Sequence, residues 1–488
     1  SDKTSAVVAG AIFTLPAIYI LQAKYPEMSA SFLKVFISSL LGGIIGILFL
    51  IPFRKYFVSD MHGKYPFPEA TATTQVLVNG AKGGNQAKPL LFAGLVGGLY
   101  DFIVATFGLW NENFTTRIVG FGETIAEKAK LVFKVNTGAA VFGLGYIVGL
   151  KYSLIICIGS FAVWWVIIPL MSVIFHDQVL NAWNPAITQT VGSMSPETIF
   201  NEYGKSIGIG GIAMAGLIGI IKSWDIIKSA VTLAAKEMKG KSTDDKKQLR
   251  TQRDLSFKVI AIGSIITLLV TFIFFWFGIM DGNLMFAVVG ILLVAVIAFL
   301  FTTVAANAIA IVGSNPVSGM TLMTLILASV VMVAVGLRGV SGMVAALIMG
   351  GVVCTALSMS GCFITDLKIG YWLGTTPKKQ ESWKFLGTLV SAATVGGVMI
   401  LLNNTYGFSS GQLAAPQANA MAAVIDPLMN GIEAPWILYI IGAIIAIVLT
   451  LFKVPAIAFA LGMFIPIELN TPLLVGGIVS WYVTSRSK

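Results

Sequence analysis

Long apolar runs recur along this chain, and they restrict its fold more than any other feature. Hydrophobic residues make up 56% of the sequence and charged residues only 11%, whereas soluble proteins carry charge on about a quarter of their residues. A soluble fold of this composition would expose large apolar patches. A membrane β-barrel would show short alternating strands instead of long runs. The sequence therefore predicts an all-α polytopic membrane protein.

About 14 of these runs, with a range of about 12 to 16, are candidate transmembrane helices, because a span needs about 20 apolar residues. Two of them, 136–150 and 454–467, are short and contain glycine or proline, which is typical of broken or re-entrant helices in transporters. The predicted spans are 6–23, 32–53, 89–109, 136–150, 152–175, 205–222, 256–279, 284–310, 318–337, 340–361, 384–402, 435–452, 454–467 and 472–484.

The basic residues of the loops predict the orientation of the chain in the membrane. Segment 222–258 contains ten lysines and arginines, whereas segment 176–204 contains none. Since basic loops stay in the cytoplasm, the first segment and both termini are predicted to be cytoplasmic and the second segment external. The net charge of +10 therefore reflects membrane topology, and no nucleic-acid partner is predicted. We predict an N-terminal transmembrane half at 1–235, a cytoplasmic basic linker at 236–254 and a C-terminal transmembrane half at 255–488.

The two halves are weakly similar in sequence, which predicts two pseudo-repeated halves. Residues 142–166 align without gaps with residues 459–483, and six of the 25 aligned positions are identical. A second alignment places Pro68 of YPFPEATATTQVL on Pro316 of GSNPVSGMTLMTL. The sequence leaves open whether the repeats are parallel or inverted, because segment 118–134 fits either an interfacial helix or a broken crossing.

Two proline-containing stretches are predicted to interrupt membrane helices. In GSNPVSGM, Pro316 removes an N–H group, and the helix that begins near Ser318 would direct its N-terminal N–H groups at a cavity, where they attract carboxylates. In HGKYPFPEATATTQVLVNG, prolines flank Phe67 and Glu69 begins a helix. The alternative for the first stretch is a tight surface loop. The alternative for Glu69 is a helix-end carboxylate that balances a nearby lysine.

Two further stretches are more polar than a lipid-facing helix allows. Asp366 and Lys368 follow the apolar run 340–361, and ionisable groups at membrane depth are functional candidates by default. The alternative is an interfacial pair that reaches toward the cytoplasmic headgroups. The stretch 413–436 is predicted to be re-entrant or to line a cavity.

The predicted substrate site lies at the membrane midplane, where the two interrupted stretches face each other and 413–436 closes the site. Proton coupling needs a group that changes charge, and since no histidine lies in a predicted span, Glu69 is the first candidate and Asp366 the second. No catalytic residue, metal site or prosthetic group is predicted, because His62 and His176 lie in loops and the cysteines lack metal-ligand spacing. The predicted substrate-binding residues are Tyr65, Glu69, Thr73, Gln75, Asn315, Ser318, Gly319, Thr321, Gln417 and Asn419.

Four motifs, KYPFPEATA, NPVSGMT, TDLKIGYWLGTTP and APQA, resemble the oligopeptide transporter (OPT) family, and in particular its bacterial branch, which is related to the yellow-stripe-like metal-chelate carriers. The resemblance extends over 6–485. It implies a proton-coupled secondary transporter in the lipid of the bacterial cytoplasmic (inner) membrane, which imports short peptides, glutathione-like peptides or metal–chelator complexes. The substrate is left open, since Phe67-Pro68-Glu69 departs from the small polar pattern of the plant carriers. Many such carriers are homodimers, but the sequence indicates no interface.

Two other classes of function fit the sequence less well. An intramembrane metalloprotease would need His-Glu-x-x-His on a helix, and a serine protease would need a base beside Ser358 or Ser360, but the predicted spans contain no histidine. Ion channels usually repeat a short pore unit across identical subunits, whereas two internal halves favour a carrier that encloses its own path. A transporter, and not an enzyme, is therefore predicted.

Overall fold

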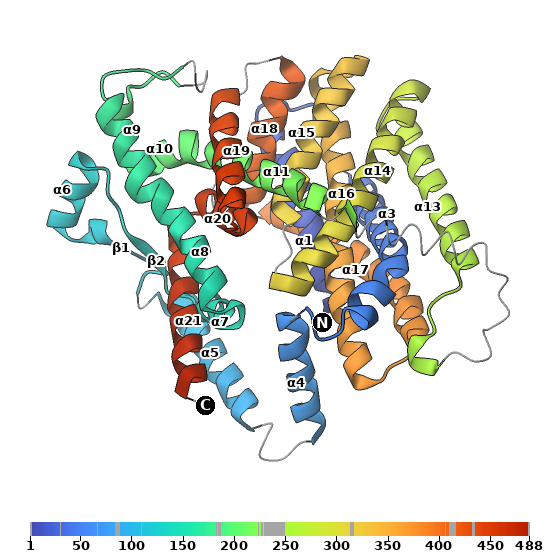
Figure 1. Ribbon diagram of the computed structural model, residues 1–488. Helices are drawn as coiled ribbons and strands as arrows, with labels where there is room; N and C mark the ends of the chain where they lie inside the picture. Colours follow the sequence, from blue (N-terminus) through green and yellow to red (C-terminus); the bar gives the residue numbers. More distant parts are fainter. Residues whose placement is uncertain are drawn as a thin grey trace. The chain divides into compact units, whose positions relative to one another are not determined.

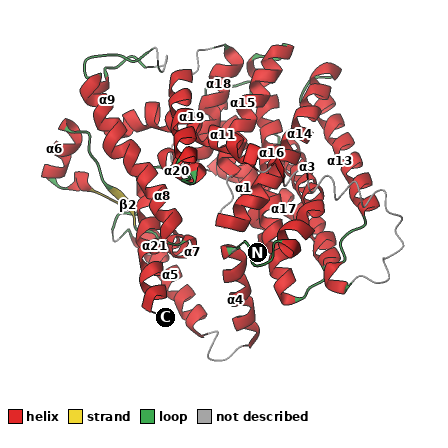
Figure 2. Ribbon diagram, viewed as in Figure 1, coloured by secondary structure: helices red, strands yellow, loops and turns green. Residues whose placement is uncertain are grey.

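The described part of the chain is almost entirely helical and contains one small two-stranded sheet (Figures 1 and 2). This confirms the helical class predicted from the apolar runs. The computed structural model describes residues 2–29, 31–65, 67–82, 88–108, 110–181, 183, 187–222, 224–225, 228, 249–312, 317–405, 407–408, 416–431 and 435–486.

Six helical segments of the described residues are long and apolar enough to cross a membrane. Shorter apolar helices accompany them, and the number of about 14 spans stays a prediction. The six segments are Phe32–Phe53, Leu150–Ile174, Arg250–Gly278, Leu284–Ala310, Gly339–Leu373 and Pro377–Thr405.

The chain forms two compact units, and each unit combines segments that are far apart in the sequence. The first unit consists of Ser1–Ala70 and Ile218–Ile432, and the second of Thr71–Leu217 and Glu433–Lys488. Each unit therefore contains segments from both predicted halves. The division into halves 1–235 and 255–488 stays a prediction about which parts of the sequence are repeated. Most of the predicted linker, 236–248, lies outside the described residues.

The first unit is built around one long helix, α16 (Gly339–Leu373), whose middle is almost completely buried. Gly42 and Gly46 of α3 lie one turn apart, against the backbones of Val352 and Ala356 of α16, and a side chain at either glycine would overlap that backbone. Small residues thus let two membrane helices approach closely. The other helices of this unit are α1 (Asp2–Thr14), α2 (Pro16–Gln22), α3 (Phe32–Leu50), α13 (Phe257–Gly278), α14 (Leu284–Val312), α15 (Val317–Val335), α17 (Pro377–Thr405) and α18 (Pro416–Asn430).

The second unit contains shorter helices and the sheet, in which β1 and β2 pair antiparallel. Segment 118–134 contains the short helix α6 and then leads into β2. Helices α4 (Pro68–Lys82) and α11 (Lys205–Lys222) contribute residues to both units. The other elements are α5 (Lys88–Phe107), β1 (Asn113–Thr115), α6 (Gly120–Lys128), β2 (Lys134–Asn136), α7 (Ala139–Val148), α8 (Leu150–Phe161), α9 (Ile168–Ile174), α10 (Pro196–Ile199), α19 (Trp436–Leu451), α20 (Ala456–Phe464) and α21 (Ile467–Arg486).

Two helix pairs of the second unit, α7–α8 and α20–α21, are equivalent in sequence and in structure. The gap-free alignment, extended by a few residues, places Ala139 and Leu150, which begin α7 and α8, on Ala456 and Ile467, which begin α20 and α21. Helix α7 packs on α21, and α8 packs on α20. The four helices therefore form two copies of one helix-pair unit.

Glycines at aligned positions make the same contacts in both copies. A Cβ atom at any of them would overlap the backbone of the opposite helix, so the packing requires glycine at these positions. Gly145 lies against Leu473 and its aligned residue Gly462 against Ile156, while Gly159 lies against Phe459 and its aligned residue Gly476 against Phe142.

The two copies are inverted relative to each other. Near the start of α8, Ser153 lies beside Gly477 of α21. Further along α8, Ser160 Oγ accepts a hydrogen bond at 2.9 Å from Nδ2 of Asn470, which precedes Gly477 in α21. The equivalent helices α8 and α21 therefore run antiparallel (Figure 1). Because equivalent antiparallel helices are related by a two-fold axis perpendicular to their length, these pairs form an inverted repeat.

Candidate functional site

Phe67 connects the first proline-containing stretch to the helix that precedes the second one. The N–H of Phe67 donates a hydrogen bond to the carbonyl oxygen of Ala310 at 3.0 Å. Ala310 lies in the last turn of α14, where carbonyl groups have no partner within the helix. Since Pro66 and Pro68 lack an N–H, Phe67 is the residue of this tripeptide that can donate. Its φ of 42° is rare for a bulky residue, so the contact is held by the surrounding structure.

The predicted interruption at the second stretch falls on residues that the structure does not describe, so it stays a prediction. Helix α14 ends at Val312 and α15 begins at Val317, while 313–316 lie outside the described residues. Asn315 and Pro316 therefore have no described position. Near the predicted contact between the two stretches, the structure describes the hydrogen bond from Phe67 to Ala310. The contact itself stays a prediction.

Lys368 of α16 lies in a small enclosure next to Phe67, which we call the Lys368 cage. Its side chain is 1% exposed. The Nζ atom donates to the carbonyl oxygen of Val58 at 2.8 Å and lies 3.0 Å from Nδ1 of His62. Three aromatic rings surround the ammonium, with centroids at 5.1 Å for Phe67, 5.0 Å for Tyr371 and 5.3 Å for Trp372. Each such ring attracts a cation through its negative face.

The two charges at the end of α16 have different partners. Asp366 Oδ2 accepts a hydrogen bond from Lys384 Nζ of α17 at 2.6 Å. Asp366 and Lys368 therefore do not pair with each other, as the alternative of an interfacial pair would require, because residues two apart in a helix do not face each other. Lys368 does not reach toward headgroups either, since its amine is enclosed. No carboxylate among the described residues forms an ion pair with Lys368.

The other predicted site residues are distributed over several elements. Tyr65 is half-buried, and the centroid of its ring lies 6.2 Å from the ring centroid of Phe57. Glu69 lies exposed in the first turn of α4, and Thr321 is fully buried where α15 packs on α16. Asn419 is exposed on α18. Thr73 and Gln75 belong to the part of α4 that lies in the second unit. For three other predicted residues the structure describes only the backbone, namely Ser318, Gly319 and Gln417.

Sequence reasoning missed the Lys368 cage, although part of its signal was visible. Lys368, Tyr371 and Trp372 stand three and four residues apart, a spacing that places side chains on one face of a helix. The contact with His62 could not be found in this way, because that residue lies about 300 positions earlier in a segment predicted as a loop.

A second charged cluster holds the small sheet of the second unit to α10. Arg117 donates hydrogen bonds to Glu123 at 2.7 Å and to Glu197 at 2.8 Å, and Lys134 Nζ lies 3.0 Å from Glu197. The hydrogen bonds from Arg117 lower the pKa of Glu123. Burial acts against ionisation of Glu197, but the bonds from Lys134 and Arg117 outweigh it and lower its pKa. All four charges are paired, which is typical of a structural cluster.

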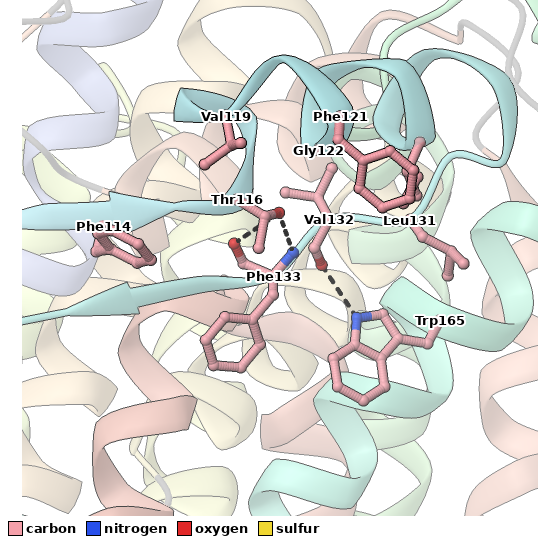
Figure 3. A pocket seen from close by; sticks show the side chains of 10 residues that line it. Phe114, Thr116, Val119, Phe121, Gly122, Leu131, Val132, Phe133 and Trp165 are labelled. Atoms are coloured by element: carbon pink, nitrogen blue, oxygen red, sulfur yellow. Dashed lines mark hydrogen bonds between the residues drawn. The ribbon is translucent and has the colours of Figure 1, made fainter.

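An open apolar groove of about 710 Å³ lies beside this sheet (Figure 3). Phe121, Phe133 and Trp165 contribute rings to its lining, and Trp165 Nε1 donates to the carbonyl oxygen of Val132 at 3.0 Å. The Thr116 hydroxyl bonds the backbone of Phe133. A site for a polar substrate needs several convergent polar groups, and this groove presents none that is free. We therefore do not place a site for a polar substrate at this groove.

The part of the chain that the structure describes contains no group of three or more His, Cys, Asp or Glu side chains that could hold a metal ion. The cysteines are also separate: Cys157 and Cys354 are buried and Cys362 is half-buried, and none of them forms a disulfide.

Comparison with known proteins gives the same family as the motifs. The family described as "OPT oligopeptide transporter protein" matches residues 2–488. A protein of Haemophilus influenzae named "Putative oligopeptide transporter" is 25% identical over 523 aligned residues, which cover 98% of this chain and 78% of that protein. Since the match extends over the whole described fold, including both copies of the inverted repeat, the chain belongs to the OPT oligopeptide transporter family.

Proposed function

We propose that this protein imports short peptides, or peptide-like or metal-chelate substrates, across the bacterial cytoplasmic membrane by alternating access. The observation that carries this proposal is the inverted repeat of short helices in the second unit. Inverted repeats with discontinuous helices are typical of secondary transporters, in which the repeats change position around a central site. The family and the name of the Haemophilus relative support a peptide as substrate.

The proposed site combines the interrupted stretches with the start of α18. Main-chain N–H groups at the start of α15 would donate hydrogen bonds to substrate oxygens, while hydroxyl and amide groups would bond peptide groups. Glu69, ahead of Asp366, would carry the coupled proton. Asp366 is the weaker candidate, because it already forms an ion pair with Lys384. We keep Tyr65, Thr73, Gln75, Asn315, Ser318, Gly319, Thr321, Gln417 and Asn419 as proposed substrate-binding residues.

The alternatives of an intramembrane enzyme and an ion channel gain no support from the described contacts. The hydroxyl of Ser360 donates to the carbonyl oxygen of Ala356 at 2.7 Å and lies 3.1 Å from that of Gly46. A buried serine hydroxyl with such contacts acts in helix packing, since a nucleophile needs a base within reach.

The proposed function is tested with purified protein in lipid vesicles under an imposed pH gradient. Labelled tripeptides and tetrapeptides are compared with a panel of metal–chelator complexes. We expect at least one class to accumulate against its gradient, and a protonophore to stop the accumulation. If every substrate merely equilibrates under all gradients, secondary active transport of these classes is excluded.

We predict that a helix break at 313–316, between α14 and α15, matters for transport more than for folding. Pro316→Ala with Gly319→Ala should favour a continuous helix, because proline and glycine are the poorest helix formers. Displacement of the binding groups should lower the uptake rate by about tenfold to a hundredfold. Gly397→Ala is the control, since a Cβ at this position of α17 meets open space. A stable double variant that transports at the wild-type rate would show that the interruption is not part of the site.

We also predict that the basic linker and both termini are cytoplasmic. A cysteine introduced by Ser242→Cys, in a segment outside the described residues, should resist an impermeant thiol reagent added to intact cells. The same reagent should label it after the membrane is opened. Labelling of intact cells would reverse the proposed orientation.

A further inference from the structure

Lys368 differs from the other buried cations of the first unit. Arg54 and Lys384 are also almost fully buried, with 3% and 1% exposure. Each of them has a carboxylate, since Arg54 Nη2 donates to Asp254 Oδ2 at 2.9 Å and Lys384 pairs with Asp366. Among the described residues, Lys368 is the buried cation of this unit that has no such partner.

A charged ammonium without a counter-ion is costly in an apolar environment. The rings of the Lys368 cage reduce this cost, but they carry no net negative charge. Neutral acceptors supply the remaining contacts, namely the Val58 carbonyl and His62 Nδ1. A buried cation of this kind in a membrane helix is a site candidate, because an anion would complete its surroundings.

The ammonium of Lys368 has one N–H donor for which the described residues supply no acceptor. A lysine ammonium has three N–H donors and no acceptor, so His62 Nδ1 accepts from it. Val58 and His62 use two donors, and the third has no acceptor among the described residues. His62 itself is exposed, so the cage lies directly behind a surface side chain.

We infer that Lys368 binds the C-terminal carboxylate of the transported peptide, an inference that rests on the proposed function. A free α-carboxylate is common to all unmodified short peptides, whatever their sequence. The cage is also joined to the proposed site, since Phe67 contributes one of its rings and bonds the end of α14. A lysine ammonium is a compact charge that can donate to an oxygen from several directions. A carrier of varied peptides requires such tolerance.

The test compares one labelled tripeptide as the free acid and as the C-terminal amide, in the vesicles described above. Wild-type uptake of the acid should exceed that of the amide by about tenfold to a hundredfold, the range for a hydrogen bond to a charged group. Lys368→Met removes the charge but retains an apolar chain of similar length for the rings. It should lower uptake of the acid to the level of the amide and leave the amide unchanged.

The control is Lys379→Met, which removes an exposed cation at the start of α17 and should preserve the preference for the acid. If Lys368→Met does not fold, Lys368→Gln replaces it, because the amide can still donate to Val58. Three results would overturn the inference: equal wild-type uptake of acid and amide, an unchanged preference in a folded charge-free variant, or the same loss in Lys379→Met. Equal uptake leaves the proposed peptide transport intact, whereas no uptake of either form shows that this tripeptide is not a substrate and removes the inference with it.

Discussion

Gly145→Ala and Gly462→Ala are expected to destabilise the second unit by about the same amount, although the two residues are far apart in the sequence. At each position a Cβ atom would overlap the backbone of a facing helix, at Leu473 for Gly145 and at Ile156 for Gly462. Backbone atoms cannot move aside as a flexible side chain can, so the helices must separate. Overpacking of this kind lowers the free energy of unfolding by about 1–3 kcal/mol for each substitution.

The matched control is Gly143→Ala, two residues from Gly145 on the same helix. A Cβ at Gly143 meets open space, and the aligned residue of the other copy, Ala460, already has one. This change should be neutral or slightly stabilising, because alanine forms helix better than glycine. Thermal unfolding of the purified protein in detergent measures all three variants. An unchanged midpoint for Gly145→Ala would mean that α7 and α21 do not pack as closely as described.

Glu69→Gln is expected to abolish uphill uptake while substrate counterflow continues. Glutamine keeps the size and polarity of the side chain but cannot exchange a proton, so transport can no longer follow the proton gradient. Glu69 lies in the first turn of α4, where the helix N-terminus favours the charged form. The side chain is exposed in this structure, so coupling requires it to lose water when the site closes.

The measurement is accumulation in vesicles with and without a pH gradient, together with exchange of labelled for unlabelled substrate. Asp366→Asn is the companion variant. It should also disturb the fold, because it leaves Lys384 buried without its ion pair. Full gradient-driven accumulation by Glu69→Gln would remove this residue from the mechanism. The same result for both variants would exclude carboxylate coupling at these sites.

The boundaries of most membrane helices follow directly from the sequence. The predicted runs 256–279 and 284–310 correspond to Phe257–Gly278 and Leu284–Val312, since uninterrupted apolar segments become helical in lipid. Helix α16 shows the limit of this reasoning. Its apolar run was predicted to end at residue 361, but the helix continues to Leu373. Asp366 and Lys368 interrupt the apolar pattern without ending the helix, because other elements supply their partners.

The sequence by itself determined the helical membrane class, the break before the helix that begins at Pro68, and the similarity of 142–166 to 459–483. It could not decide whether the similar segments are parallel or inverted, because both arrangements use the same residues. The antiparallel contact of α8 with α21 decided this in the second unit. The partners of Asp366 and Lys368 were likewise decided by tertiary structure. A buried charge is stabilised by whichever groups the packing brings near, and for Lys368 these lie about 300 residues away.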